Sequence, residues 1–258
     1  MKIGFIGYGN MASAIATAIV DEKLVPSKDI YASARNYEKL VNNCSKININ
    51  ACKDNKDVII NSDFVILCVK PYMVEKVLED NLKYLDNKVL ISIVAGYDFD
   101  KYEKILNGIC HHISTIPNTP IAVRSGILIC ENKHNLSEEE LEYFSYLFNK
   151  ISLMIYVDSN NLSIAGTMAG CTPAFTAMYM EALADAGVKY GLTRTEDYNI
   201  VAQMLVGTGK LYLATNEHPG IMKDKVCSPH GTTIKGVSAL EKNGFRGSVI
   251  SAIDEIEK

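Results

Sequence analysis

Short apolar runs alternate with segments of helical spacing through the first part of the chain. Four runs predict strands, at residues 2–6, 30–34, 64–69 and 89–94. Apolar residues at helical spacing predict helices between them, at 11–20, 37–42 and 74–85. The runs at 64–69 and 89–94 are apolar almost throughout, which indicates a sheet covered on both faces. Strands and helices in alternation therefore predict a parallel, right-handed, doubly wound sheet of the α/β class.

The pattern continues to residue 158 and then changes. Three further strands are expected at 112–116, 126–130 and 153–157, and Ser137 followed by Glu140 predicts a capped, acidic helix over 137–150. Beyond residue 158 there is no strand candidate, and helical patterns occupy 160–187, 194–216 and 231–242. We therefore predict two domains, an α/β domain over 1–158 and an all-helical domain over 159–258.

Composition narrows the class of partner. The chain has 258 residues, of which 48% are hydrophobic, and its 26 Lys and Arg against 30 Asp and Glu lack the basic excess that nucleic acids or anionic membranes require. We expect no nucleic-acid partner, no transmembrane helix and a small-molecule substrate. The glycines and Asn10 in the first twenty residues argue against a signal peptide.

Cysteines and histidines indicate neither disulfides nor a metal. The seven cysteines are scattered without a C-x-x-C pair, so we expect small buried apolar residues in a reducing compartment. This compartment is either the cytoplasm, which we favour, or an organelle matrix. His111 and His112 are adjacent and would point to opposite faces of a strand, and the other three histidines fit no ligand spacing.

The first strand is followed by the pattern G-x-G-x-x-A, from Gly7 to Ala12. Gly7 permits a tight turn, Gly9 lets backbone N–H groups approach a pyrophosphate, and Ala12 allows close packing of the next helix. Asn10 and Met11 open that helix, whose N-terminus faces the negative charge. The pattern predicts a Rossmann-like dinucleotide site, with a purely structural glycine turn as the alternative.

The end of the second predicted strand bears on the cofactor. An Asp or Glu there would favour NAD(H), whereas this chain has Ser33, Ala34, Arg35 and Asn36. A hydroxyl, a guanidinium and an amide suit a phosphate monoester, so we expect NADP(H), with NAD(H) as the second choice. An ordinary solvated arginine is the alternative interpretation of Arg35.

Two later strand ends carry polar candidates. Lys70 ends the apolar strand at its carboxyl edge, where open parallel sheets bind ligands, and is either a cofactor residue or a lysine that ends a strand in solvent. Pro117 and Pro120 fix a turn around Asn118. This turn either presents Asn118 to the cleft, as a substrate residue, or is only rigid.

The segment 224–233 is the most unusual one. Ser228, Thr232 and Thr233, together with Gly231, precede a helix expected from about Ile234. Hydroxyls and free backbone N–H groups at a helix start bind carboxylates, and an N-cap needs only one hydroxyl. We therefore favour a carboxylate site over an N-cap with spare threonines.

These motifs together resemble the pyrroline-5-carboxylate reductase family. The resemblance spans almost the whole chain and is carried by GYGNMA at 7–12, VKP at 69–71, PNTP at 117–120, EALADAGVKYGL at 181–192, HPG at 218–220 and KDKVCSPHGTTIKGVSALEKNGF at 223–245. It implies NAD(P)H-dependent reduction of the cyclic imine 1-pyrroline-5-carboxylate to L-proline, the last step of proline biosynthesis. It also implies that the helical domain binds substrate and dimerises, in a homodimer or a larger homo-oligomer such as a decamer.

The resemblance also assigns roles to residues. It implies that the glycine turn is joined in cofactor binding by Ser33, Asn55, Val69, Lys70, Pro71 and Ala95. It implies that Ser228, Gly231, Thr232 and Thr233 hold the substrate, with Thr233 nearest the imine nitrogen and thus the catalytic candidate. Three positions depart from the family pattern, which usually has a Gly at His230, S-G-S-G-P-A where Thr172 lies, and in some members a Glu at Asn216.

Two other functions fit parts of the sequence. A β-hydroxyacid dehydrogenase shares the two-domain plan but needs a Lys base on the first helix of its second domain, and residues 167–188 contain no Lys or His. A non-catalytic, NADP-sensing protein with a decayed site is supported only by the departures at His230 and Thr172. The missing base favours an imine as hydride acceptor.

Overall fold

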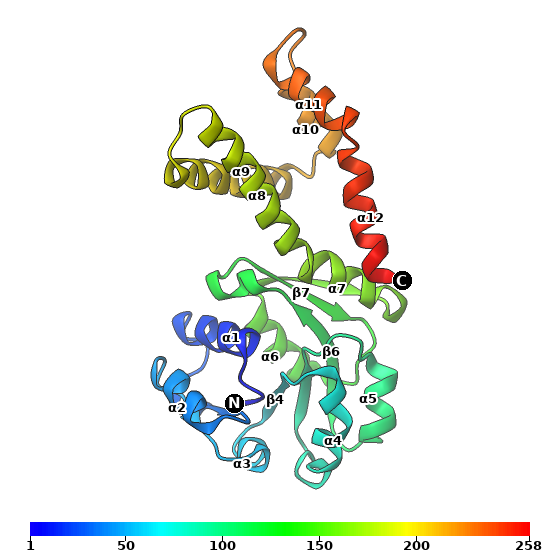
Figure 1. The fold of residues 1–258 in the computed structure, drawn as a ribbon. Coiled ribbons are helices and arrows are strands. Elements are labelled where there is room, and N and C mark those ends of the chain that lie inside the picture. Colours follow the sequence, from blue (N-terminus) through cyan, green and yellow to red (C-terminus); the bar gives the residue numbers. More distant parts are fainter. The chain divides into compact units, whose positions relative to one another are not determined.

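The structure, a computed structural model, describes residues 1–258 and divides into two compact units (Figure 1). The N-terminal unit covers Met1–Cys171 and the helical unit covers Thr172–Lys258. Helix α7 (Leu162–Gly170) packs on strands β6 and β7 of the N-terminal unit, so this unit extends beyond the domain boundary predicted at residue 158. The division into domains at residue 158 therefore stays a prediction.

The N-terminal unit is built on one sheet of eight strands in the order β3-β2-β1-β4-β5-β6-β7-β8. Their bounds are β1 Ile3–Ile6, β2 Ile30–Ser33, β3 Asn50–Ala51, β4 Phe64–Leu67, β5 Val89–Ser92, β6 His111–Pro117, β7 Gly126–Glu131 and β8 Ser152–Val157. All neighbours are parallel except β6 and β7, which are antiparallel. The parallel, doubly wound sheet predicted from the alternation is confirmed, and the antiparallel pair arises because only the short turn η4 (Thr119–Val123), and no crossover helix, joins β6 to β7.

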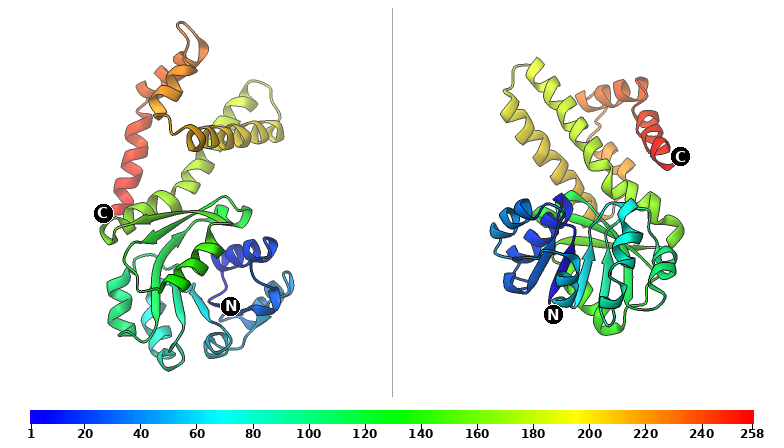
Figure 2. Two further views of the ribbon diagram at one scale, coloured as in Figure 1. Left: turned by 180° about the vertical axis from the view of Figure 1, so that it is seen from behind. Right: turned by 60° about the horizontal axis from the view of Figure 1, so that its bottom comes forward.

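Helices cover both faces of this sheet, as the doubly wound prediction requires (Figures 1 and 2). Besides α7, they are α1 Asn10–Asp21, α2 Tyr37–Ser45, α3 Asn55–Ile60, α4 Val74–Glu79, α5 Phe99–Leu106 and α6 Glu138–Phe148. Alternate strand residues enter two separate cores: Phe64 and Ile66 of β4 pack with α1 and α6, whereas Val65 and Leu67 pack with α3, α4 and α5. Each strand is therefore buried on both sides, which explains its unbroken apolar sequence.

Several helix boundaries differ from the expectation. The helix expected over 74–85 ends at Glu79 and is followed by the 3₁₀ turn η3 (Leu82–Tyr84). Helices α3 and α5 were not predicted, although Asp54 and Asp98 cap them by accepting hydrogen bonds from backbone N–H groups three residues on. The capping box of Ser137 and Glu140 is confirmed at the start of α6.

The helical unit contains five helices and few buried side chains. They are α8 Thr172–Lys189, α9 Arg194–Thr215, α10 Pro219–Lys225, α11 Thr232–Lys242 and α12 Phe245–Glu257. The segment predicted as one helical stretch over 160–187 is divided between α7 and α8. Helices α10, α11 and α12 have no buried residue, and large apolar side chains such as Met178, Leu213 and Ile250 are exposed. Such apolar surfaces are typical of a unit that packs against another subunit.

All seven cysteines are free thiols. Cys44, Cys110 and Cys130 are buried as expected, whereas the other four are only half-buried. None of the helices combines the length and the apolar character needed to span a lipid bilayer.

Candidate functional site

A cavity of about 340 Å³ lies at the glycine turn of the N-terminal unit. It opens at the carboxyl ends of β1, β2 and β4, the edge at which parallel sheets bind ligands. Its lining residues are Gly7, Tyr8, Gly9, Ala34, Arg35, Asn36, Lys39, Leu40, Asn55, Cys68, Val69, Lys70, Met73 and Val77. The turn between β1 and α1, the end of β2 and the end of β4 thus form one site.

The two glycines of the turn serve different purposes. Gly7 has a φ of +89°, and a Cβ there would lie 2.6 Å from the Cys68 carbonyl oxygen. Gly9 is the N-cap of α1, makes no side-chain cap, and has open space where a Cβ would project. Because the first turn of α1 also lacks acidic residues, its free N–H groups are available to an anion. This geometry fits the pyrophosphate of a dinucleotide.

Every charged side chain that lines the cavity is a cation. These are Arg35, Lys39 and Lys70. Burial raises the pKa of the Cys68 thiol and of the Tyr8 phenol, so both groups stay neutral. A cavity of this charge attracts a ligand that carries several phosphates.

Two polar residues at the end of β2 are already engaged within the protein. The Ser33 hydroxyl, which is buried, donates to Asn55 Oδ1 at 2.7 Å. Asn36 Oδ1 caps α2 by accepting the Lys39 backbone N–H at 2.9 Å. The expectation that the Ser33 hydroxyl offers its proton to a phosphate stays a prediction, and it requires this hydroxyl to leave Asn55 Oδ1. In the structure Ser33 orients Asn55, which lines the cavity.

Arg35 and Lys39 are the free groups at this end of the cavity. Both side chains are exposed, and neither forms an ion pair. Lys39 was not among the predicted cofactor residues, although it lies in the first turn of the helix predicted over 37–42, shortly after Arg35. Two cations beside the first amides of α2 are well suited to a phosphate monoester.

Six of the predicted cofactor residues line the cavity, namely Gly7, Gly9, Arg35, Asn55, Val69 and Lys70. Asn10 and Met11 follow Gly9 as the first residues of α1, and Pro71 follows Lys70 at the start of the 3₁₀ turn η2 (Pro71–Met73). Ala95 is exposed just beyond β5 and does not line the cavity. These assignments stay predictions at the level of individual contacts.

The predicted carboxylate site forms one compact turn in the helical unit. Helix α11 begins at Thr232, two residues earlier than expected, with Gly231 as an N-cap that has no side chain to bond the helix. The Gly231 N–H donates to the Ser228 carbonyl at 2.9 Å, and a Cβ on Gly231 would lie 2.4 Å from Ser228 Oγ. Ser228, Thr232 and Thr233 are exposed around this helix start. The four predicted substrate residues therefore lie together in one turn of the helical unit.

His230 occupies a backbone position that favours glycine. Its φ is +59°, in the left-handed region. The departure from the family pattern at this position therefore changes a side chain and adds strain, but the turn keeps its form.

Asn118 lies inside the fold. Its Nδ2 donates to the Ala169 carbonyl at 3.1 Å, and its Oδ1 accepts the Ile127 N–H at 2.8 Å. The side chain is buried and holds α7 and β7 to the turn. The expectation that the turn presents Asn118 to a substrate is wrong, and the rigid-turn alternative describes the structure.

No group of three or more His, Cys, Asp or Glu side chains is arranged to hold a metal ion. A Rossmann-type sheet with a cationic cavity at its glycine turn, joined to a helical unit, defines a dinucleotide-dependent oxidoreductase. Two family models match the chain: "NADP oxidoreductase coenzyme F420-dependent" over residues 2–96 and "Pyrroline-5-carboxylate reductase dimerisation" over residues 159–258.

Comparison with similar proteins identifies the family. The pyrroline-5-carboxylate reductase of Treponema pallidum is 40% identical over 98% of this chain and 97% of its own length, and that of Escherichia coli is 33% identical over 98% and 94%. The crystal structure of Plasmodium falciparum pyrroline carboxylate reductase with NADP bound has a TM-score of 0.90, at 28% identity over 99% of this chain and 95% of that one. The chain belongs to the pyrroline-5-carboxylate reductase family, as the sequence resemblance indicated. This membership favours a reductase over a β-hydroxyacid dehydrogenase or a non-catalytic NADP sensor.

Proposed function

We propose that the chain reduces 1-pyrroline-5-carboxylate to L-proline, with NADPH as the preferred hydride donor. The observation that carries this proposal is the cavity at the glycine turn, whose charged lining groups are all cations and whose helix start is free of a side-chain cap. Its lining includes Gly7, Tyr8 and Gly9 of GYGNMA and Val69 and Lys70 of VKP, two of the motifs on which the family resemblance rests.

The cofactor would be held from both ends of the cavity. The N–H groups at Gly9, Asn10 and Met11 would hold the pyrophosphate, and Arg35 with Lys39 would hold the 2′-phosphate. Asn55, Val69, Lys70 and Pro71 would contact the ribose and the remaining backbone, with Ala95 near the nicotinamide. When bound, NADPH supplies the hydride for the reduction.

The substrate carboxylate is the natural handle for orientation. The hydroxyls of Ser228, Thr232 and Thr233 and the first N–H groups of α11 would hold it, which fixes the ring for hydride transfer at roughly 3 to 3.5 Å. A protonated imine is already electrophilic and needs little acid catalysis. Thr233 Oγ would hydrogen-bond the developing amine, with the proton supplied by water or by the protonated substrate. Because the proton comes from water or from the substrate itself, the turn at 228–233 needs no acidic side chain to donate it.

Assembly and location extend the proposal. The exposed apolar side chains of the helical unit support a homodimer formed through residues 159–258, and a decamer is the larger assembly we propose. Light scattering coupled to gel filtration measures both. Seven free cysteines support a reducing compartment, in keeping with a cytoplasmic enzyme.

The direct test is NADPH oxidation by the purified chain. Addition of the imine should produce steady loss of NADPH absorbance and formation of L-proline, identified by chromatography. NADPH binding without turnover would favour the sensor, and reduction of NADP⁺ by a β-hydroxyacid would favour the dehydrogenase. Either result contradicts the proposed function.

A further inference from the structure

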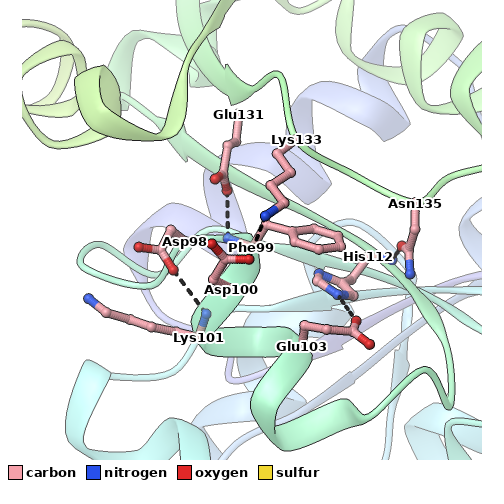
Figure 3. A network of polar contacts seen from close by, with 9 residues as sticks. All are labelled: Asp98, Phe99, Asp100, Lys101, Glu103, His112, Glu131, Lys133 and Asn135. Carbon is pink, nitrogen blue, oxygen red and sulfur yellow. Dashed lines mark hydrogen bonds and ion pairs between the residues drawn. The ribbon is translucent and has the colours of Figure 1, made fainter.

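A fully buried carboxylate lies at the end of β7, away from the cofactor cavity (Figure 3). Glu131 Oε2 accepts the backbone N–H of Phe99 at 2.7 Å, and Oε1 accepts the hydroxyl of Ser159 at 2.5 Å. Phe99 is the first residue of α5, and Ser159 opens the 3₁₀ turn η5 (Ser159–Asn161). One side chain thus joins three elements, and each of its oxygens has a partner.

The bond to Phe99 fixes one end of the loop between β5 and α5, residues 93–98. The other end is fixed at the sheet, where Ile93 N–H donates to the Leu67 carbonyl and Val94 N–H donates to Ser92 Oγ, both at 3.1 Å. Between these ends the loop exposes Ala95 and Gly96, and Gly96 has a φ of +83°. The position of Ala95 therefore depends on how firmly both ends are held.

Other contacts also hold the start of α5. The buried Tyr102 hydroxyl is hydrogen-bonded to Ser92 Oγ of β5 at 2.5 Å, and Lys101 Nζ donates to the Gly96 carbonyl of the loop at 2.6 Å. Asp98 caps the helix through the Lys101 N–H, which orders the first turn but attaches it to nothing else. The ion pair of Lys133 with Asp100 at 2.6 Å reaches another element, but both side chains are mostly exposed, and exposed pairs of this kind contribute little. Glu131 is therefore the buried side chain that bonds the backbone of the first residue of α5 to β7 (Figure 3).

The surroundings of Glu131 provide partners for both of its oxygens. Its partner on α5 is a first-turn N–H, the end of a helix that favours negative charge. His112 is buried nearby, stacked on the Phe99 ring with centroids 4.3 Å apart. The stacking on His112 and the hydrogen bond to Glu131 together hold Phe99 in one place.

We propose that Glu131 is a positioning residue for the cofactor. By fixing Phe99, it holds the loop that carries Ala95 in the place where the nicotinamide end of NADPH binds. This inference rests on the proposed function, in which Ala95 contacts the cofactor. It assigns to Glu131 an effect on NADPH binding in addition to an effect on stability.

The test uses four variants of the full chain. Glu131→Ala removes both bonds, and we expect the KM for NADPH and the Kd of NADPH without substrate to rise about tenfold. Glu131→Gln should stay within about twofold of the parent, because its amide oxygen accepts the Phe99 N–H and its amide nitrogen donates to Ser159. Ser159→Ala, which removes only the second bond, should also stay within about threefold. Ser152→Ala is the control, since it removes a buried bond to the Phe148 carbonyl remote from the loop and from the cavity and should lower only the melting temperature.

The binding measurement decides the outcome. An unchanged Kd in Glu131→Ala, measured by NADPH fluorescence well below its melting temperature, would overturn the proposal, and so would an equal rise in Glu131→Gln. If Glu131→Ala does not fold, Glu131→Asp replaces it, because the shorter side chain cannot reach both partners, and its Kd should rise several-fold. A Kd of Glu131→Asp equal to that of the parent overturns the proposal. Because Kd needs no imine, this test remains valid if the parent protein binds NADPH but fails to reduce the imine.

Discussion

Helices α1 and α11 begin in the same way but in different surroundings. Both have glycine N-caps, Gly9 and Gly231, and neither has a side-chain cap or an acidic residue in its first turn. Helices α2, α3, α5, α6 and α9 are instead capped by Asn36, Asp54, Asp98, Ser137 and Thr193. A side-chain cap contributes about 1 kcal/mol to a helix, so its absence at α1 and α11 leaves donors to a ligand at a cost in stability.

The surroundings separate the two helix starts. The turn at Gly9 lies against two packed cores and opens into a defined cavity, with Gly7 in close contact with Cys68. The turn at Gly231 lies in a helix without buried residues, and Thr232 and Thr233 are exposed. The cavity proposed for the cofactor is lined by residues of the N-terminal unit, whereas the turn proposed for the substrate lies exposed within the helical unit.

The largest effect should come from giving α1 the cap that it lacks. The backbone at Gly9 has a φ of −94° that Asp adopts readily, and there is open space for its side chain. Gly9→Asp should raise the free energy of unfolding by a few tenths of a kcal/mol. It should also lower kcat/KM by at least about a hundredfold, since its carboxylate takes the free N–H groups and repels phosphate. Calorimetry and steady-state kinetics measure the two effects, and Gly9→Ala is the control without charge. Normal NADPH affinity in Gly9→Asp would contradict the assignment of α1 as the pyrophosphate site.

The second effect tests the substrate turn. Thr233→Ala should lower kcat/KM for the imine by about tenfold to several hundredfold and leave the KM for NADPH near normal, because only a contact to the substrate is removed. Ser238→Ala, on the same exposed helix but outside the first turn, should have no effect. Unchanged kinetics in Thr233→Ala would remove this residue from the site.

A smaller effect distinguishes the two phosphate groups within the cofactor cavity. Lys39→Gln should raise the KM for NADPH about tenfold, or about 1.4 kcal/mol, and leave the KM for NADH unchanged. Arg35→Gln should act in the same direction. Lys46→Gln, at the far end of α2, is the matched control. An equal loss with NADH would show that Lys39 faces a part common to both cofactors.

The smallest effect concerns the backbone of the substrate turn. His230→Gly should relieve the left-handed conformation at φ +59° but increase the freedom of the unfolded chain. The two terms nearly cancel, so the free energy of unfolding should rise by no more than about 1 kcal/mol, measured by denaturant titration. A clear loss of stability would mean that the His230 side chain makes a favourable contact.

Much of the sheet could be predicted because its strands are apolar on both faces. The exceptions have local causes. Strand β3 has two residues, too few for a pattern, and helices α3 and α5 expose enough charged residues to hide their apolar faces. Strands β6 and β7 are antiparallel because the chain turns back directly after β6 and does not cross over through a helix. A hydrophobic pattern does not distinguish these two connections.

Site residues whose role depends on backbone geometry could be predicted from the sequence. Residues whose role depends on the direction of the side chain were predicted less well. Gly7 and Gly231 are found by their place before a helix. Asn118, between two prolines, has the same polar character whether it faces a ligand or its own backbone, and the structure has it bonded to Ala169 and Ile127. Ser33 is similar, because its partner Asn55 is 22 residues away in the chain.

The scarcity of buried side chains in the helical unit has a consequence for how the enzyme behaves on dilution. Helices that lack an interior of their own gain most of their stabilisation by association, so the folded fraction follows mass action. The melting temperature should therefore climb with protein concentration, and specific activity should decline in very dilute assays.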